Sequence, residues 1–465
     1  MSGAGSMRDR LTGALARSRA DYAEVRFERA WSSRVSFRAN RLEVAAESAD
    51  AGGCVRVLFK GRGWGVASFT TLDDLPAMIA AAEEMSRAVV LEEPVRLAEV
   101  PPRVDEVVPA IDGDPRDVPL AEKRKFLEAL NALMLGASPR IADTQAGYYD
   151  VRTEWYFANS EGTWLHEVRP EIGVSAQATA RDGATIERHL DSVAYRKGWR
   201  SVQGLEPMFR NAAAKAVELL AAPSVRGGTY PVVLDPRLAG VFVHEAFGHL
   251  SEADFVYENP QAREMMTLGR RFGSDLVNIG DDGSAAGLRG TLPYDDEGTP
   301  TRRTELIREG ILVGRLHSRE TAATMGEQPT GNARAISFRH PPIVRMTNTY
   351  IEGGGGTFED LIADIKLGVY AADWVGGQTF LENFSFSAAH GFMIRDGKVA
   401  EMVKDVVLGG NLFKSLQSID AVAGDFRFNV TGGGCGKGGQ SPLPVTEGAP
   451  HVRFAELLVG GEVEA

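Results

Sequence analysis

The chain has 465 residues, of which 63 are acidic and 51 are basic, and its formal net charge is −12. A chain of this length is expected to form two or three domains, each able to bury its own core. The negative charge disfavours binding to nucleic acids and anionic lipids, so we expect neither nucleic acid nor membrane among the partners.

Two further features indicate a cytoplasmic protein. No stretch approaches the roughly 20 apolar residues that span a bilayer, and no apolar segment follows the arginines near the N-terminus as in a secretory signal. Cys54 and Cys435 are the only cysteines, which excludes a disulfide framework and fits a reducing compartment.

The first hundred residues predict helices and an antiparallel sheet. A polar helix is expected over residues 6–19, and apolar and polar residues then alternate with the period of half-buried strands. Residues 54–69 resemble a hairpin, and residues 75–88 read as a helix with alanines along one side. We therefore expect an α+β domain over residues 1–100.

A second α+β domain is expected over residues 119–226, after a proline-rich, charged linker at 101–118. Pro119 marks the start of a helix that runs to about Leu135, and a further helix is expected over residues 208–222. Between these helices the pattern predicts separate short strands, at residues 148–158, 163–169 and 172–180.

Beyond residue 227 the pattern changes to many short strands and few helices. We expect a β-rich, partly barrel-like C-terminal domain over residues 227–465. The predicted fold class is therefore α+β, with antiparallel sheets in the two N-terminal regions and a β-rich C-terminal domain. The strand candidates of this domain are residues 304–307, 311–316, 343–350, 383–394, 399–408 and 426–430.

The most informative stretch is His244-Glu-x-x-x-His249, in which Glu245 follows the first histidine directly. A zinc-binding helix usually has its histidines four residues apart, about 40° from each other around the axis. Five residues on a regular α-helix give about 140°, too far apart to share one ion easily. A π-type turn of about 4.4 residues would reduce the angle to about 50°, and Gly248 would give the backbone the freedom to form it.

The surroundings of this motif favour a functional site over a hydrogen-bonded structural helix. The flanking residues are apolar, so the segment is expected to be buried, where histidine and glutamate are costly unless they are paired or bound to a metal. Glu245 would then lie beside the metal as a general base. The apolar neighbours are Val241, Phe242, Val243, Ala246 and Phe247.

Cys435 lies in a glycine-rich stretch, residues 431–440, that allows several interpretations. A phosphate-binding P-loop is excluded because Thr431 and Gly438 occupy positions that need other residues. The spacing of Gly434, Gly436 and Gly439 resembles a dinucleotide fingerprint, but Ser441-Pro-Leu-Pro444 follows instead of a helix, so no such cofactor is expected. A flexible turn and a tight loop presenting one thiolate to a metal remain open, and two histidines with one cysteine form an allowed zinc set.

These motifs together resemble the TldD/PmbA metallopeptidases, once called modulators of DNA gyrase. The resemblance covers nearly the whole chain and is strongest from about Tyr230 to Ser441. Its elements are the histidine motif followed by Leu-Ser-Glu-Ala-Asp254, then Tyr294-Asp-Asp-Glu-Gly-Thr299, Gly331-Asn-Ala-Arg334, the segment from Arg339 to Asn348, and Cys435-Gly-Lys with Gly-Gln-Ser441.

The resemblance implies that His244, His249 and Cys435 bind Zn²⁺, with Glu245 as the base. It points to the TldD side of the family, because the TldE (PmbA) partners typically lack the histidine motif. It also implies a homodimer or a heterodimer with a TldE/PmbA-like paralogue. We therefore expect a zinc-dependent peptidase that cleaves unfolded segments or short peptides.

Alternatives remain for the whole protein and for single residues. The chain could be a non-catalytic peptide-binding or partner subunit of a paralogous complex, or an amidase that matures one modified peptide. His340 and His390 are either oxyanion-stabilising groups or hydrogen-bonded loop histidines. Glu252 or Asp254 could orient a ligand imidazole, and Cys54 is expected in the core.

Overall fold

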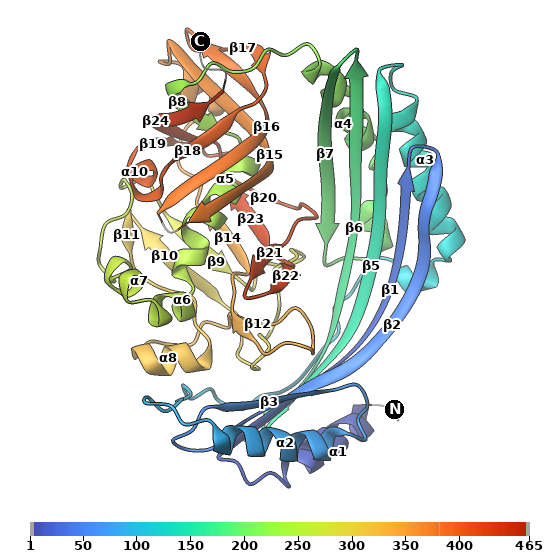
Figure 1. The fold of residues 1–465 in the computed structure, drawn as a ribbon, viewed down its shortest axis with the longest axis vertical. Coiled ribbons are helices and arrows are strands. Elements are labelled where there is room, and N and C mark those ends of the chain that lie inside the picture. Colours follow the sequence, from blue (N-terminus) through green and yellow to red (C-terminus); the bar gives the residue numbers. More distant parts are fainter. Residues whose placement is uncertain (1–3, 381, 462–465) are drawn as a thin grey trace.

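The computed structural model describes residues 4–380 and 382–461, and a long curved sheet forms one side of the molecule (Figure 1). Its strands follow the order β3-β2-β1-β5-β6-β4, with β7 paired to β6. The strands are β1 Tyr22–Arg38, β2 Arg41–Leu58, β3 Trp64–Phe69, β4 Val104–Val107, β5 Ile141–Asn159, β6 Trp164–Asp182 and β7 Thr185–Tyr195. Because β1 pairs with β5, strands from the first hundred residues and from the central region share this sheet.

The strands of this sheet are longer than the sequence pattern predicts. The two strands expected at 163–169 and 172–180 are one strand, β6, which passes through Pro170 without a break. β4 pairs with β6 over Trp164–Glu167 and β7 pairs with it from Ile172 onward. Pro170 lies between these two partners, where no backbone N–H is needed on that side.

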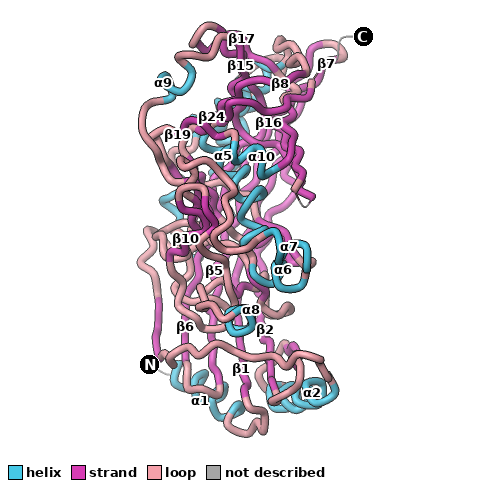
Figure 2. The backbone as a smooth tube through the Cα atoms, turned by 90° about the vertical axis from the view of Figure 1, so that its left-hand side faces the viewer, coloured by secondary structure: helices cyan, strands magenta, loops and turns pink. Residues whose placement is uncertain are grey.

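Helices cover the sheet at both of its ends. At one end, α1 (Ala4–Leu15) and α2 (Leu75–Ala88) pack on β1–β3, and α2 has the bounds predicted from the sequence. At the other end, α3 (Leu120–Leu135) and α4 (Glu206–Leu219) pack on β5, β6 and β7 around a second apolar core. Figure 2 shows α1 and α2 at one end of the molecule and β17 at the other.

The C-terminal region is β-rich, as predicted, and contains a closed ring of strands. The path β15-β8-β24-β18-β16 returns to β15, and β17 and β19 extend it. These strands are β8 Gly228–Leu234, β15 Leu367–Phe380, β16 Asn383–Arg395, β17 Lys398–Val403, β18 Val407–Asn411, β19 Ile419–Val422 and β24 Val452–Gly460. The ring confirms the partly barrel-like, α+β architecture expected from the sequence.

A six-stranded sheet and two short hairpins lie beside this ring. The sheet follows the order β11-β10-β9-β14-β23-β20. Its strands are β9 Ile279–Asp282, β10 Arg303–Arg308, β11 Ile311–Leu312, β14 Asn348–Ile351, β20 Arg427–Asn429 and β23 Thr446–Ala449. The short pairs are β12 Ala333–Arg334 with β13 Ile343–Val344, and β21 Cys435–Lys437 with β22 Gln440–Leu443.

Short helices complete the C-terminal region, and α5 is the one that positions the candidate site. Phe242 of α5 packs edge-on against Phe384, Phe386 and Phe454 of the ring, with ring centroids 5.2–6.1 Å apart. The helices are α5 Pro236–Val243, α6 Ala253–Glu258, α7 Pro260–Met265, α8 Arg319–Met325, α9 Phe358–Ile362 and α10 Leu412–Gln417.

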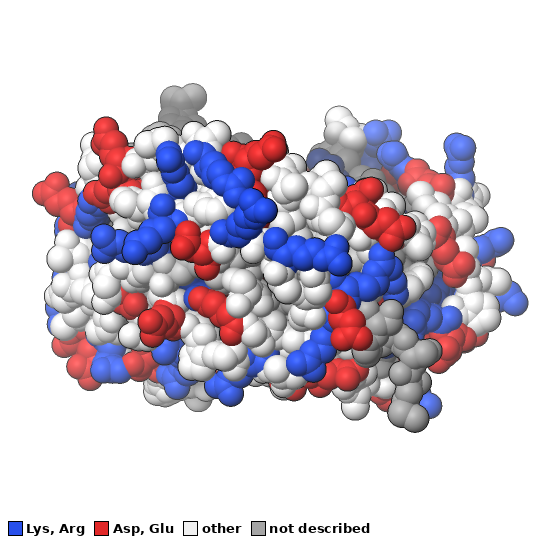
Figure 3. Space-filling model, turned by 90° about the horizontal axis from the view of Figure 1, so that it is seen from below, with Lys and Arg blue, Asp and Glu red and all other residues white. Residues whose placement is uncertain are grey.

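Two properties of the described residues concern charge and helix length. On the face shown in Figure 3, Lys and Arg side chains are interspersed with Asp and Glu. Within residues 4–380 and 382–461, no helix is long and apolar enough to cross a membrane.

Candidate metal centre

The histidine motif begins where α5 ends. Asp235 caps the start of α5, because its carboxylate accepts a hydrogen bond of 2.8 Å from the backbone N–H of Leu238. Pro236 occupies the first turn, where its missing N–H is not needed. The helix then runs for eight residues to Val243. Its apolar side chains fix it in the core, so the residues that follow are held rigidly.

The backbone changes to a π-helix over His244–Gly248. The N–H of His249 donates to the carbonyl of His244, five residues earlier, whereas in an α-helix the acceptor lies four residues earlier. This is the departure from α-helical geometry that the spacing of the two histidines predicts. It brings the two imidazoles together at a centroid distance of 5.2 Å and an angle of 84°.

Gly248 was expected to give this turn backbone freedom, but the structure shows that it provides space. Its backbone has φ −55° and ψ −55°, a conformation open to any residue, so glycine's special freedom is not used. A Cβ atom at this position would instead lie 2.0 Å from the sulfur of Met346. The glycine is needed because the turn packs directly against that side chain.

Gly248→Ala is therefore expected to lower the free energy of unfolding by about 1–3 kcal/mol, as overpacking of a core does. Removing the obstructing sulfur with Met346→Ala should reduce the cost of the alanine, so the two changes should be coupled in a double-mutant cycle. Gly13→Ala is the control, because Gly13 lies in α1 and a Cβ there meets nothing within 4 Å. Equal costs with and without Met346 would contradict this account.

Cys435 reaches the histidines from the β21–β22 hairpin. Arg289 holds the glycine-rich approach to this hairpin, because its guanidinium donates to the carbonyls of Thr431 and Gly433. The same guanidinium donates to Glu171 of β6, with Nη2 2.7 Å from Oε1. The loop that carries the thiol is thus tied to the large sheet.

The structure brings the three predicted ligands together. One ligand atom each from His244, His249 and Cys435 lies within 4.8 Å of the others, and His249 Nε2 is 3.3 Å from Cys435 Sγ. His244 and Cys435 are buried, and His249 is partly exposed. Two imidazoles and one thiolate match the catalytic zinc set, in which three protein ligands leave one position open.

The electrostatics of the cluster favour the thiolate that a metal needs. Burial alone would raise the pKa of the Cys435 thiol, but the imidazoles of His244 and His249 outweigh it and lower that pKa to about 4. Burial likewise opposes the charged form of His244, yet the neighbouring thiolate raises its pKa to about 9. The side chains therefore suit a divalent cation, which would replace the protons that they hold between them.

Residues behind the ligands fix their orientation. His249 Nδ1 lies 3.0 Å from Glu252 Oε2, which leaves Nε2 turned toward the thiol. Lys437 Nζ lies 3.0 Å from that same oxygen and 2.6 Å from Asp254 Oδ1. Burial would raise the pKa of Glu252, but His249 and Lys437 lower it to about 2. Of the two acids considered from the sequence, Glu252 contacts the ligand and Asp254 holds the lysine.

Lys437→Met should weaken zinc binding by about 10- to 100-fold, the usual cost of losing a group that orients a ligand. Without the ammonium, Glu252 and Asp254 lose their common partner and His249 is less firmly held. Zinc affinity measured by competition with a chromophoric chelator provides the test. Lys398→Met, at an exposed residue that begins β17, is the matched control. An unchanged zinc affinity in the Lys437 variant would show that Lys437 does not help to orient His249.

Sequence reasoning missed Lys437 and Glu447 as parts of this centre. Glu447 of β23 places its Oε1 3.9 Å from His244 Nδ1. Gly240 allows α5 to approach this strand, since a Cβ there would lie 3.1 Å from Glu447 Cβ. No local pattern marks Glu447, because it reaches the site from a strand two hundred residues away.

Glu245 lies beside the cluster and lines a cavity of about 610 Å³. His249, Gly436 and Lys437 line the same cavity, so it opens onto the ligands and the Cys435 hairpin. Another part of its wall comes from α6, α7 and the residue between them, through Phe255, Gln261 and Asn259. A carboxylate at this place can exchange protons with a molecule held next to the ligand cluster.

The other histidines considered from the sequence lie elsewhere. His340 contributes its carbonyl to Arg26 of β1, at 2.8 Å. His390 of β16 lies with His189 and Asp373. Cys54 is buried in β2, as expected, and burial raises the pKa of its thiol.

The other motifs of the resemblance form buried hydrogen bonds around the Cys435 hairpin. Asp295 accepts hydrogen bonds from the N–H groups of Glu297, Thr299 and Ala333. Arg334 donates to the carbonyl of Pro444, and Arg345 donates to that of Gln440. These buried contacts shape the backbone around β22 instead of forming part of the ligand cluster.

Comparisons with known proteins agree with this geometry. Models of three domains of the PmbA/TldA metallopeptidases match the chain: domain 1 at residues 23–88, the central domain at 113–221 and the C-terminal domain at 227–461. A metalloprotease of Synechocystis sp. is 44% identical over 96% of this chain and 96% of its own. A zinc metalloprotease TldD homolog of Saccharolobus solfataricus is 28% identical over 96% of this chain and 97% of its own.

The solved structures show the same fold at low sequence identity. TldE from Thermococcus kodakarensis superposes with a TM-score of 0.76 at 19% identity, over 98% of this chain and 100% of the other. This likeness shows the shared fold, and the family models and the Synechocystis relative establish the family. The chain belongs to the TldD/PmbA family of metallopeptidases.

Proposed function

We propose that this protein is a zinc-dependent peptidase, in which His244, His249 and Cys435 hold the metal and Glu245 acts as general base. The observation that carries the proposal is the convergence of three metal-binding atoms within 4.8 Å, next to a cavity lined by Glu245. The thiolate favoured at Cys435 and the imidazole oriented by Glu252 suit zinc in particular.

When bound, zinc would lower the pKa of a coordinated water and polarise the scissile carbonyl. The chain's own residues supply the proton transfers. Glu245 accepts a proton from the attacking water and then passes it to the amine that leaves. Glu252 keeps His249 in the tautomer that presents Nε2, and Lys437 keeps Glu252 in place.

The cavity beside Glu245 suits an extended peptide. β21 forms part of its wall through Gly436 and Lys437, and within the described residues β21 pairs only with β22. The other edge of β21 can therefore hydrogen-bond a substrate backbone, with little selection for its side chains. Folded proteins offer no free strand, so we propose that unfolded segments and short peptides are the substrates.

The decisive experiment compares metal content and peptide cleavage in the wild-type protein and in His244→Ala. We expect turnover in the wild type and none in the variant, which should bind one zinc ion fewer per chain. A panel of unrelated unstructured peptides should be cleaved, and one of these sequences placed within a stable folded domain should be resistant. A correctly folded wild-type protein that takes up no zinc would refute the proposal. Capture of peptides by zinc-loaded protein without cleavage would instead indicate a binding subunit.

We further propose that the protein acts as a dimer, with itself or with a TldE-like paralogue. The structural likeness to TldE across nearly the whole chain supports this, because two chains of one fold can pair through equivalent surfaces. Native mass spectrometry of the protein alone, and mixed with a paralogue from the same genome, should show a two-chain assembly. A monomer under both conditions would exclude it.

A further inference from the structure

A second group of metal-binding side chains lies between the large sheet and the C-terminal ring. His189 comes from β7, Asp373 from β15 and His390 from β16. One potential ligand atom from each residue lies within 4.8 Å of the other two, as in the cluster of His244, His249 and Cys435. Figure 1 shows β7 as the strand of the large sheet next to the β15–β16 hairpin.

The imidazoles in this group are buried without hydrogen-bond partners. His189 is 2% exposed and His390 is 5% exposed. Neither ring nitrogen of His189 has a partner among the described residues, and the same holds for Nδ1 of His390. Buried polar atoms are normally satisfied, so the two unpartnered nitrogens that lie toward Asp373, Nε2 of His189 and Nδ1 of His390, indicate a missing ligand.

The carboxylate of Asp373 faces these nitrogens, but it is too far from them for a hydrogen bond. Its Oδ2 is 3.9 Å from His189 Nε2 and 3.8 Å from His390 Nδ1, beyond hydrogen-bonding range. Two ligands bound to one zinc ion at about 2.1 Å lie roughly 3.4 Å apart in tetrahedral geometry. The gap therefore fits a shared ion after a small inward movement of the side chains.

The backbone of Asp373 is strained in a way that turns its side chain toward the histidines. It has φ +55°, in the left-handed region, and lies beside an irregularity in the β15–β16 pairing. Non-glycine residues in this conformation concentrate at sites that clamp ligands. Its second oxygen, Oδ1, accepts a hydrogen bond of 3.0 Å from Arg237, which leaves Oδ2 for the histidines.

The charges around the group leave room for a cation. Asp191 and Asp373 both accept hydrogen bonds from the single guanidinium of Arg237. Asp235 accepts one from the backbone N–H of Asp373, and burial and the Asp373 carboxylate raise the pKa of Asp235 to about 7. Lys215 and Glu218 of α4 also face the group, but they pair with each other at 3.0 Å. The remaining balance is negative by one charge when Asp235 is protonated and by two when it is ionised, which favours a cation at this place.

We propose that His189, Asp373 and His390 form a second metal site that takes a divalent transition metal ion, with zinc as the expected occupant. Imidazole nitrogens with one carboxylate suit zinc and exclude magnesium and calcium, which prefer all-oxygen sites. This inference does not depend on the proposed peptidase activity, because it concerns another set of residues.

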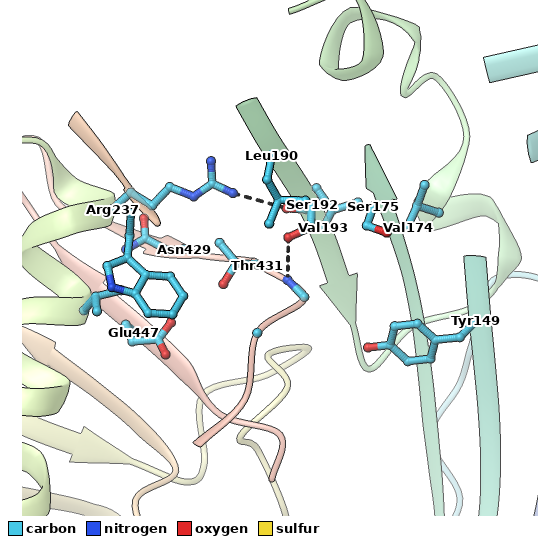
Figure 4. A pocket seen from close by; sticks show the side chains of 14 residues that line it. Tyr149, Val174, Ser175, Leu190, Ser192, Val193, Arg237, Asn429, Thr431 and Glu447 are labelled. Atoms are coloured by element: carbon cyan, nitrogen blue, oxygen red, sulfur yellow. Dashed lines mark hydrogen bonds between the residues drawn. The ribbon is translucent and has the colours of Figure 1, made fainter. Parts of the chain in front are cut away.

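An ion at this site would join β7 to the ring. Residues of β7 and of the C-terminal region line a common cavity of about 370 Å³. Figure 4 shows this cavity, with Arg237 reaching the carbonyl of Ser192 on β7. The hydroxyl of Ser192 accepts a hydrogen bond of 3.0 Å from the N–H of Gly432, three residues before Cys435. β7 thus contributes His189 to the second site and contacts the loop that leads to Cys435, so the second metal would serve as a structural clamp between the sheet and this loop.

Metal counting tests the proposal on the full-length protein, stripped with a chelator, reloaded with zinc and dialysed. We expect two zinc ions per chain in the wild type and one in His189→Gln and in His390→Gln. His451→Gln is the control and should keep two, because His451 already has partners in Asp425 and Tyr370. Glu245→Gln should also keep two, so loss of peptidase activity and loss of the second metal are separate outcomes.

Cobalt substitution shows which site each glutamine variant has lost. The second site contains no sulfur, so both variants should retain the thiolate-to-cobalt charge-transfer band of Cys435 while binding one cobalt fewer. A wild-type protein that binds one metal ion per chain, and keeps it in both glutamine variants, would overturn the proposal. Two ions retained in both glutamine variants would also overturn it.

Crystals of the zinc-loaded wild type cover the case in which the variants fail to fold. Anomalous scattering at the zinc absorption edge should give a peak within bonding distance of His189, Asp373 and His390. A water molecule without anomalous signal at this position would overturn the assignment.

Discussion

Glu245→Gln is expected to lower kcat/KM for peptide cleavage by about 100- to 10,000-fold, while zinc stays bound. The amide keeps the size of the side chain that lines the cavity, but it cannot accept a proton from water at neutral pH. Because Glu245 is not one of the three converging ligands, the metal content should equal that of the wild type.

Rates measured with one unstructured peptide, together with zinc content, check this expectation. Glu258→Gln is the matched control, since Glu258 is an exposed residue of α6 and should retain full activity. Loss of zinc from the Glu245 variant would mean that this carboxylate is a ligand. Undiminished turnover would assign the general base to another group.

Cys435→Ser should abolish tight zinc binding at the cluster it forms with His244 and His249, with a larger loss than the roughly 10- to 100-fold expected for residues that only orient a ligand. The serine hydroxyl stays protonated at neutral pH, so the site loses its anionic ligand and the charge that favours a divalent cation. Peptide cleavage should disappear with the metal. A Cys435 variant with wild-type zinc affinity would contradict the assignment.

Alkylation of the wild type gives an independent view of the same thiol. With its pKa near 4, Cys435 is a thiolate above that pH and a thiol below it, so the zinc-free protein should react at an almost constant rate from about pH 6 to 8. Bound zinc should protect it. Cys54 is the internal control, because burial raises the pKa of its thiol and it should react slowly in both states.

The ligand cluster could be predicted from the sequence because most of its residues lie close together along the chain. His244, Glu245 and His249 lie within six residues, and their spacing alone requires the π-helical turn that the structure shows. Cys435 stood out because glycines surround it. The helix Leu75–Ala88 was similarly predictable from its alanine-rich periodicity.

Contacts between distant segments could not be predicted in this way. Glu447 faces His244 only because α5 packs on β23, and Lys437 matters only because Glu252 lies opposite it. The role of Gly248 was misjudged for the same reason, since Met346 is far away along the chain. Likewise, alternation in β1 and β5 predicts strands but does not say that these two strands pair.

In the proposed zinc site, the separation of the ligands along the chain determines when the metal can be bound during synthesis. His244 precedes Cys435 by about 190 residues, and β8, which leads into α5, pairs with the late strand β24. At about 5–20 residues per second, a ribosome needs roughly 10–40 s to travel from the first ligand to the third. During that time the histidines have neither the thiolate nor the closed ring that holds them. Tight metal capture is thus delayed until translation is almost finished, and any factor that delivers zinc must act on a nearly complete chain.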